Sequence, residues 1–104
     1  MSDLNAAFAQ ALRDMRHKAD LSQTDFPPMV SREHVSLMER GMRSPSLNTI
    51  DDLAHVMGIS PLTLVLQCYL HRDPSTTFDA LISRAAREIR TEMIHDGLKN
   101  DGDS

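Results

Sequence analysis

A helical spacing of apolar residues repeats along the length of this chain. Apolar side chains recur three and four positions apart, and no segment shows the alternation typical of a strand. The spacing predicts an all-α fold with helices over about residues 4–18, 31–40, 46–57, 60–70 and 76–96, and a short further helix after residue 22. We therefore expect a compact five-helix domain over 1–70, followed over 71–104 by a C-terminal amphipathic helix and a polar tail.

Cap and stop signals set the ends of these helices. Ser22 followed by Asp25 has the form of a capping box, which starts the second helix. Pro27 and Pro28 limit that helix to about one turn, because proline inside a helix loses a hydrogen bond and clashes with the preceding turn. Serines are placed to cap the next three helices and glycines to end two of them: Ser31, Ser46, Ser60, Gly41 and Gly58.

The C-terminal helix carries a continuous apolar stripe. Its residues recur at spacings of three and four: Phe78, Leu81, Ile82, Ala85, Ile89 and Met93. A stripe of this length needs an apolar partner, which either the first domain or the same helix of a second subunit can supply. We expect the second subunit, and hence a homodimer joined through these residues.

Composition limits the classes of function that remain. The chain has one cysteine, no apolar run near the ~18 residues of a membrane span, and no basic and apolar leader at its N-terminus. A soluble, cytoplasmic protein that makes no membrane contact is expected. The five histidines are scattered, Cys68 and His71 are too few ligands for a zinc site, and no catalytic motif occurs. We therefore expect no cofactor, no metal and no enzymatic activity.

The net charge of −4 argues against nucleic-acid binding by the chain as a whole, because a phosphate-binding face usually makes a small domain basic. The distribution of charge matters more than the total. Between residues 31 and 44, three arginines stand against two glutamates. The middle of the chain is therefore locally positive.

Several short motifs occur together in one order. They are Ala11-Leu12-Arg13-Asp14-Met15-Arg16, Leu21-Ser22-Gln23, Met38-Glu39-Arg40-Gly41, Arg43-Ser44-Pro45-Ser46, Leu53-Ala54 and Gly58-Ile59-Ser60. From about residue 8 to residue 66, they resemble the Cro/repressor (XRE-like) helix-turn-helix family of transcriptional regulators, whose fold is the lambda-repressor-like DNA-binding domain. Between Phe26 and Val30 the chain is two residues shorter than the family pattern.

The resemblance implies roles for residues on both sides of the turn. Arg16 and Glu39 would form a structural ion pair between the first helix and the recognition helix. Gln23, at the start of the second helix, would contact a phosphate. The alternative interpretation is that Gln23 is an exposed residue beside the helix cap and has no role in binding. Base edges would meet Ser31, Arg32, Glu33 and Leu37, with Ser36 on the same outer face, and phosphates would meet Arg40 and Arg43 in the following loop. For each of the base-contacting residues, the alternative interpretation is that it lies on a helix face that contacts only water.

The leading hypothesis is a sequence-specific DNA-binding transcriptional regulator, with repression as the expected sense of control. It would bind double-stranded DNA at a pseudo-palindromic operator as a dimer, with helix 31–40 in the major groove. The alternative is a protein-interaction module of the same fold, an anti-activator or antitoxin-like adaptor, that binds a protein partner and binds DNA weakly or not at all. Net acidity and the shortened Pro27-Pro28 segment favour the adaptor, whereas the local arginines and the intact flanking motifs favour the regulator.

Overall fold

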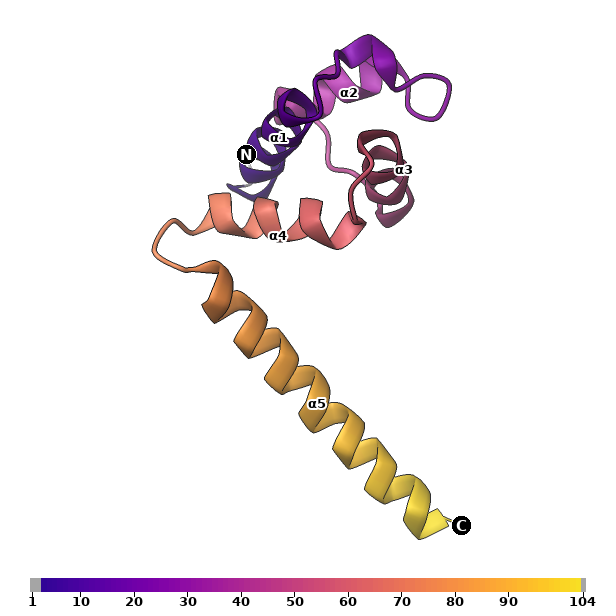
Figure 1. Ribbon diagram of the computed structural model, residues 1–104, viewed down its shortest axis with the longest axis vertical. Helices are drawn as coiled ribbons and strands as arrows, with labels where there is room; N and C mark the ends of the chain where they lie inside the picture. The colour runs from indigo at the N-terminus through magenta and orange to yellow at the C-terminus, as the bar shows by residue number, and fades with distance from the viewer. Residues whose placement is uncertain (1–2, 104) are drawn as a thin grey trace. The chain divides into compact units, whose positions relative to one another are not determined.

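The computed structural model describes the backbone of residues 3–103 and the side chains of residues 3–91. Every regular element in that range is helical, which confirms the all-α expectation. The elements are α1 (Asp3–Lys18), the 3-10 turn η1 (Gln23–Asp25), α2 (Arg32–Glu39), α3 (Leu47–Met57), α4 (Pro61–Arg72) and α5 (Phe78–Asp103) (Figure 1). The chain divides into two compact units, Met1–Pro74 and Ser75–Ser104, which are described in turn.

Serine side chains begin three helices of the first unit. The hydroxyl oxygens of Ser31, Ser46 and Ser60 accept hydrogen bonds from backbone N–H groups in the first turns of α2, α3 and α4. These bonds satisfy N–H groups that have no partner within their own helix. At the other end of α3, Gly58 adopts a left-handed conformation with φ of 70°. The helix boundaries therefore follow from cap residues that are visible in the sequence.

The second of the five expected helices is the single 3-10 turn η1. Its capping box is complete, because Ser22 accepts from the backbone of the turn and Asp25 accepts from the Ser22 backbone N–H at 2.7 Å. Phe26 and Val30 are buried on either side of the exposed Pro27-Pro28-Met29 segment. The shortened connection is therefore anchored in the core at both of its ends.

The core of the first unit forms around α1. This helix packs against both α2 and α4, and α4 lies below α1 and α3 in the view of Figure 1 and contacts both. The largest fully buried side chains come from five segments of the chain: Leu12, Phe26, Val35, Met38, Leu53 and Leu64. Burial of one such side chain contributes about 1.5–3 kcal/mol. Packing of this kind holds α2 by its inner face.

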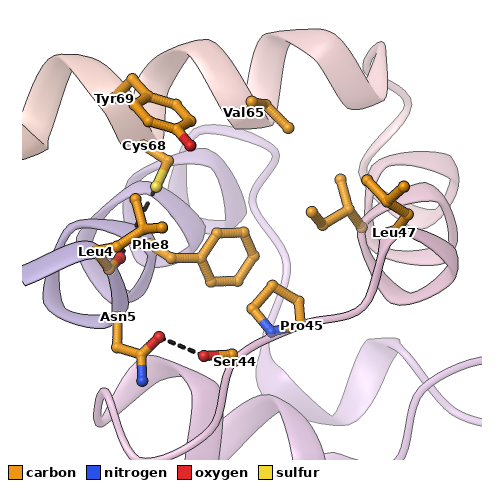
Figure 2. Close-up of a pocket in the computed structure, with 10 residues that line it drawn as sticks. Leu4, Asn5, Phe8, Ser44, Pro45, Leu47, Val65, Cys68 and Tyr69 are labelled. Atoms are coloured by element: carbon orange, nitrogen blue, oxygen red, sulfur yellow. Dashed lines mark hydrogen bonds between the residues drawn. The ribbon is translucent and has the colours of Figure 1, made fainter. Parts of the chain in front are cut away.

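An apolar hollow opens where α1, α3 and α4 meet the turn before α3 (Figure 2). Its walls include Leu4 and Phe8 from α1, Pro45 and Leu47 from the turn and α3, and Val65 and Tyr69 from α4. At its rim the Ser44 hydroxyl donates a hydrogen bond to Asn5 Oδ1. The turn between α2 and α3 is thereby tied to α1.

The second unit consists of α5 and the residues that lead into it. Thr77 Oγ1 accepts a hydrogen bond from the Ala80 N–H at 3.1 Å and so caps the helix. Phe78 and Ile89 of the apolar stripe are exposed on α5, and the side chain of Met93 lies outside the described residues.

Two predicted helix ends are wrong. α4 continues to Arg72 instead of ending at residue 70, and α5 continues to Asp103 instead of ending near residue 96. The reason for the second difference is that glycine weakens a helix by only about 1 kcal/mol, while each residue added to a helix that already exists gains one hydrogen bond. Gly97 and Gly102 therefore did not end the helix as expected.

Within residues 3–103, no single helix is long and apolar enough to cross a membrane. Only α3 and α4 taken together meet those two criteria, and they are bent by 107° at their junction. Leu53, Ala54 and Met57 of α3 and Leu64 and Cys68 of α4 are buried in the first unit.

Candidate nucleic-acid interface

The helix expected to read DNA is α2, and its two faces differ in burial. Val35 and Met38 are 0% exposed and lie in the core. Among the expected base-contacting residues, Ser31, Arg32 and Glu33 are exposed, and Ser36 and Leu37 are half-buried. One face of α2 is therefore fixed by packing, and the other is open to a ligand.

A shallow hollow on the open face gathers side chains of different chemistry. It is lined by Ser31, Glu33, His34, Leu37 and Arg43. Hydroxyl, carboxylate, imidazole and guanidinium groups can exchange hydrogen bonds with base edges, and leucine can contact the methyl group of thymine. Four of the residues expected at the interface thus lie together, whereas Arg32, Ser36, Arg40 and Gln23 do not line this hollow.

The turn that follows α2 exposes two arginines. α2 ends at Glu39, Arg40 is its C-terminal cap residue, and Gly41 follows with φ of 72°. Arg40 and Arg43 are exposed on either side of this reversal, and Arg40 Nε also donates to Ser36 O at 3.4 Å. Exposed arginines beside a helix end suit contacts with phosphate oxygens.

Arg16 of α1 and Glu39 of α2 lie in a buried ion pair. Arg16 Nε donates to Glu39 Oε2 at 2.6 Å, and Arg16 Nη2 donates to Glu39 Oε1 at 2.8 Å. Arg16 Nη1 donates to the carbonyl of Leu21 at 3.0 Å. The hydrogen bonds to Glu39 raise the pKa of Arg16. Burial of the guanidinium group lowers this pKa, and the negative charge of Glu39 raises it further. Arg16 therefore stays charged and joins α1, the start of the helix-turn-helix segment and α2.

Gln23 has a protein partner that the sequence did not suggest. Its side-chain Nε2 donates to Glu39 Oε1 at 3.1 Å, so that η1 also contacts the carboxylate held by Arg16. Gln23 is half-buried in this position. The side chain expected to meet a phosphate is therefore oriented by the same carboxylate that orients α2.

Cys68 and His71, the one pair with metal-like spacing, make separate contacts. Cys68 is 4% exposed, and burial raises the pKa of its thiol, an effect that Arg72 partly opposes. The His71 ring nitrogen Nε2 donates to Asp14 Oδ2 at 2.9 Å. In the part of the chain that the structure describes, no three His, Cys, Asp or Glu side chains group in a way that could hold a metal ion.

Sequence reasoning missed two residues near the interface. His34 lines the hollow on α2, and Arg13 of α1 donates from Nη1 to the backbone carbonyl of Glu39 at 3.1 Å. Both lie three positions from a residue that was singled out, Ser31 and Arg16 respectively, and residues three apart share a helix face. That spacing was the available signal.

The first unit is a helix-turn-helix domain. It is a compact group of helices in which η1 and α2 stand on either side of a tight connection, and the buried ion pair of Arg16 and Glu39 joins α1 to α2. A family model described as helix-turn-helix matches residues 12–64, just over half of the chain. The chain belongs to the Cro/C1-type helix-turn-helix family and is, in general terms, a DNA-binding regulator. Comparison with curated proteins and with solved structures gave no match.

Proposed function

We propose that this chain is a transcriptional repressor that binds a pseudo-palindromic operator as a homodimer, with α2 in the major groove. The observation that carries the proposal is the gathering of Ser31, Glu33, Leu37 and Arg43 around one hollow on the open face of a helix whose inner face is buried. Sequence reading needs such a surface, because bases are distinguished by donors, acceptors and methyl groups presented in the groove.

Two sets of residues would perform different tasks on the DNA. Ser31, Arg32, Glu33, Ser36 and Leu37 would meet base edges, and Gln23, Arg40 and Arg43 would meet phosphates. Base contacts determine sequence preference, whereas phosphate contacts supply affinity that depends on salt concentration. The local excess of arginine between residues 31 and 44 supports this assignment despite the net charge of −4.

The proposed dimer uses the apolar stripe of α5 in each subunit. Helix-turn-helix dimers bind two half-sites, and the twofold symmetry of the protein sets the symmetry of the operator. The proposed place of action is the cytoplasm, because the DNA that the regulator would bind lies there. It requires no catalytic step and no cofactor.

A second candidate is an adaptor of the same fold that binds a protein partner. Its support is the net charge of −4, together with an exposed Pro27-Pro28-Met29 segment in which Met29 is 47% exposed. Such a protein would have no preference among DNA duplexes.

Selection of binding sites from random duplex DNA tests the proposal directly. A repressor of this kind should enrich a palindromic sequence. Failure of the wild-type protein to prefer any duplex at moderate salt would reject the regulator and leave the adaptor.

Substitutions then separate the two sets of residues on the selected site. Arg32→Ala should relax preference at one operator position, weakening the best site by about 1–3 kcal/mol and random DNA little. Arg40→Ala or Arg43→Ala should weaken all duplexes alike and reduce the salt slope by about one unit per lost phosphate contact, or about two in a symmetric dimer. Lys18→Ala, which removes an exposed charge on α1, is the control.

A further inference from the structure

The last four carbonyl groups of α2 have no partner among the residues of the helix itself, as at any helix end. Three of them find partners in the turn that follows. The Arg40 N–H donates to Ser36 O at 3.1 Å, the Met42 N–H to Leu37 O at 3.0 Å, and the Gly41 N–H to Met38 O at 3.1 Å. The shape of the turn is therefore maintained by bonds back to α2.

The fourth carbonyl, that of Glu39, accepts from a different helix. Arg13 Nη1 of α1 donates to Glu39 O at 3.1 Å. Glu39 is thus held at two points by α1, through its carbonyl by Arg13 and through its carboxylate by Arg16. A positive side chain at the C-terminal end of a helix is also favoured by the helix dipole.

Arg13 is itself oriented by a chain of hydrogen bonds that reaches α4. Its Nη2 donates to Gln10 Oε1 at 3.0 Å, and Gln10 Nε2 donates to Asp14 Oδ1 at 2.8 Å. Asp14 Oδ2 accepts from His71 Nε2 of α4 at 2.9 Å. Arg13 is half-buried and its guanidinium group is bound on both of its arms, so its position is fixed before any ligand arrives.

We propose that Arg13 is a positioning residue of the DNA-binding surface: by holding the last carbonyl of α2, it fixes the turn from Arg40 to Arg43 in the arrangement that meets phosphates. The inference rests on the function proposed above. Arg13 acts through the turn and does not touch the DNA. A lysine cannot replace it, because an ammonium group lacks the planar, two-armed geometry that joins Glu39 to Gln10.

The test compares Arg13→Met and Arg13→Lys with Lys18→Met, which removes one positive charge from the exposed end of the same helix. Each protein is titrated with the selected duplex well below its melting temperature, so that every variant is folded. Both Arg13 variants should bind about tenfold more weakly than wild type, because binding must then restore the turn arrangement that the lost hydrogen bond to a charged group had held in place. Lys18→Met should bind much as wild type does.

Hydrogen exchange without DNA supplies the readout that is specific to positioning. The amides of Gly41 and Met42 should exchange faster in both Arg13 variants than in wild type or Lys18→Met. Gln10→Met should have a smaller effect of the same kind, and none when added to Arg13→Met, because Gln10 reaches the turn only through its bond with Arg13.

Three results would overturn the inference while leaving the proposed function intact. The first is an affinity of Arg13→Met for the duplex that equals that of wild type. The second is an affinity restored in Arg13→Lys, because that result would make Arg13 a direct phosphate contact. The third is an unchanged rate of amide exchange at Gly41 and Met42. A wild-type protein that binds no duplex would instead remove the proposed function, and the role of Arg13 with it.

Discussion

Glu39 is the residue on which the polar contacts between α1, η1 and α2 converge. Its carboxylate accepts from Arg16 and Gln23, and its carbonyl accepts from Arg13. With only 3% of its surface exposed, it depends on these partners, because an unpaired charge in that position would be unstable. A single side chain thus connects α1, η1 and α2.

The pair formed by Arg16 and Glu39 should behave as one unit in unfolding experiments. Replacing either by alanine leaves its partner charged and buried, and should lower the free energy of unfolding by about 3–5 kcal/mol. The double replacement should lower it by less than the sum. Urea melts of wild type, the two single variants and the double variant give the coupling energy between the two side chains. Arg16→Lys is a control that keeps the positive charge but loses the two parallel hydrogen bonds of the guanidinium group. Strictly additive losses would show that the two side chains act independently.

The buried thiol of Cys68 predicts a dependence of stability on pH. Burial raises the pKa of this group in the folded protein, so as pH increases the unfolded chain loses the proton first. Stability is therefore fully present below the ordinary thiol pKa of about 8.5 and declines above it. Denaturant melts from pH 7 upward should show this decline in wild type relative to Cys68→Ala. Parallel pH profiles for the two proteins would contradict the prediction.

Some of these residues were within reach of sequence reasoning and others were not. Arg16 and Glu39 stand in motifs whose order is visible in the chain. The bonds from Arg13 to Glu39 O and from Gln23 to the Glu39 carboxylate depend on how α1 crosses α2 and on where η1 lies, and both are set by tertiary packing. Glu33 and Leu37, which the helical spacing places outside the core face, line the hollow on α2, and their contact with DNA stays a prediction.

The starts of helices were easier to predict than their ends. Serine caps make local bonds within three residues, so Ser31, Ser46 and Ser60 could be identified without knowing the fold. Pro27 and Pro28 likewise limit η1 by local sterics. The ends of α4 and α5 were both placed too early, because α4 continues to Arg72, two residues before Pro74, and α5 continues through Gly97.

The two glycines that follow helices should show equal conformational strain when substituted. Gly41 and Gly58 have φ of 72° and 70°, and a Cβ would meet ordinary contacts near Asn5 and Ala6 at the first and open space at the second. Gly41→Ala and Gly58→Ala should each lower stability by about 1–2 kcal/mol, and the asparagine variants by less. Thermal melts measure this. A far larger loss at Gly41 would point to a steric clash there.

The first unit contains its own core and the whole family match, whereas the second is a single helix with an apolar stripe. A lone amphipathic helix has little stability in water without a surface to pack against. The proposed dimer supplies that surface from a second subunit.

Removal of residues 75–104 should give a folded monomer. This deletion ends after Pro74, so α4 and its terminal bond from the Asp73 N–H to Tyr69 O remain intact. Light scattering should show a dimer for the full chain and a monomer for the shortened one, both with a cooperative melt. Leu81→Glu in the full chain should have the same effect on mass. A shortened protein that stays dimeric, or a full chain that is monomeric at high concentration, would place the interface elsewhere or remove it.

The contact between Gln23 and Glu39 has a consequence for the thermodynamics of operator binding. Ordering a flexible side chain at an interface opposes binding by about 0.5–1.5 kcal/mol in lost rotamer freedom. Gln23 loses that freedom on folding, since Glu39 already selects its rotamer. In the proposed complex its phosphate contact would therefore carry a smaller entropy penalty than the contacts of exposed Arg32 and Arg43, which must be ordered when the DNA arrives.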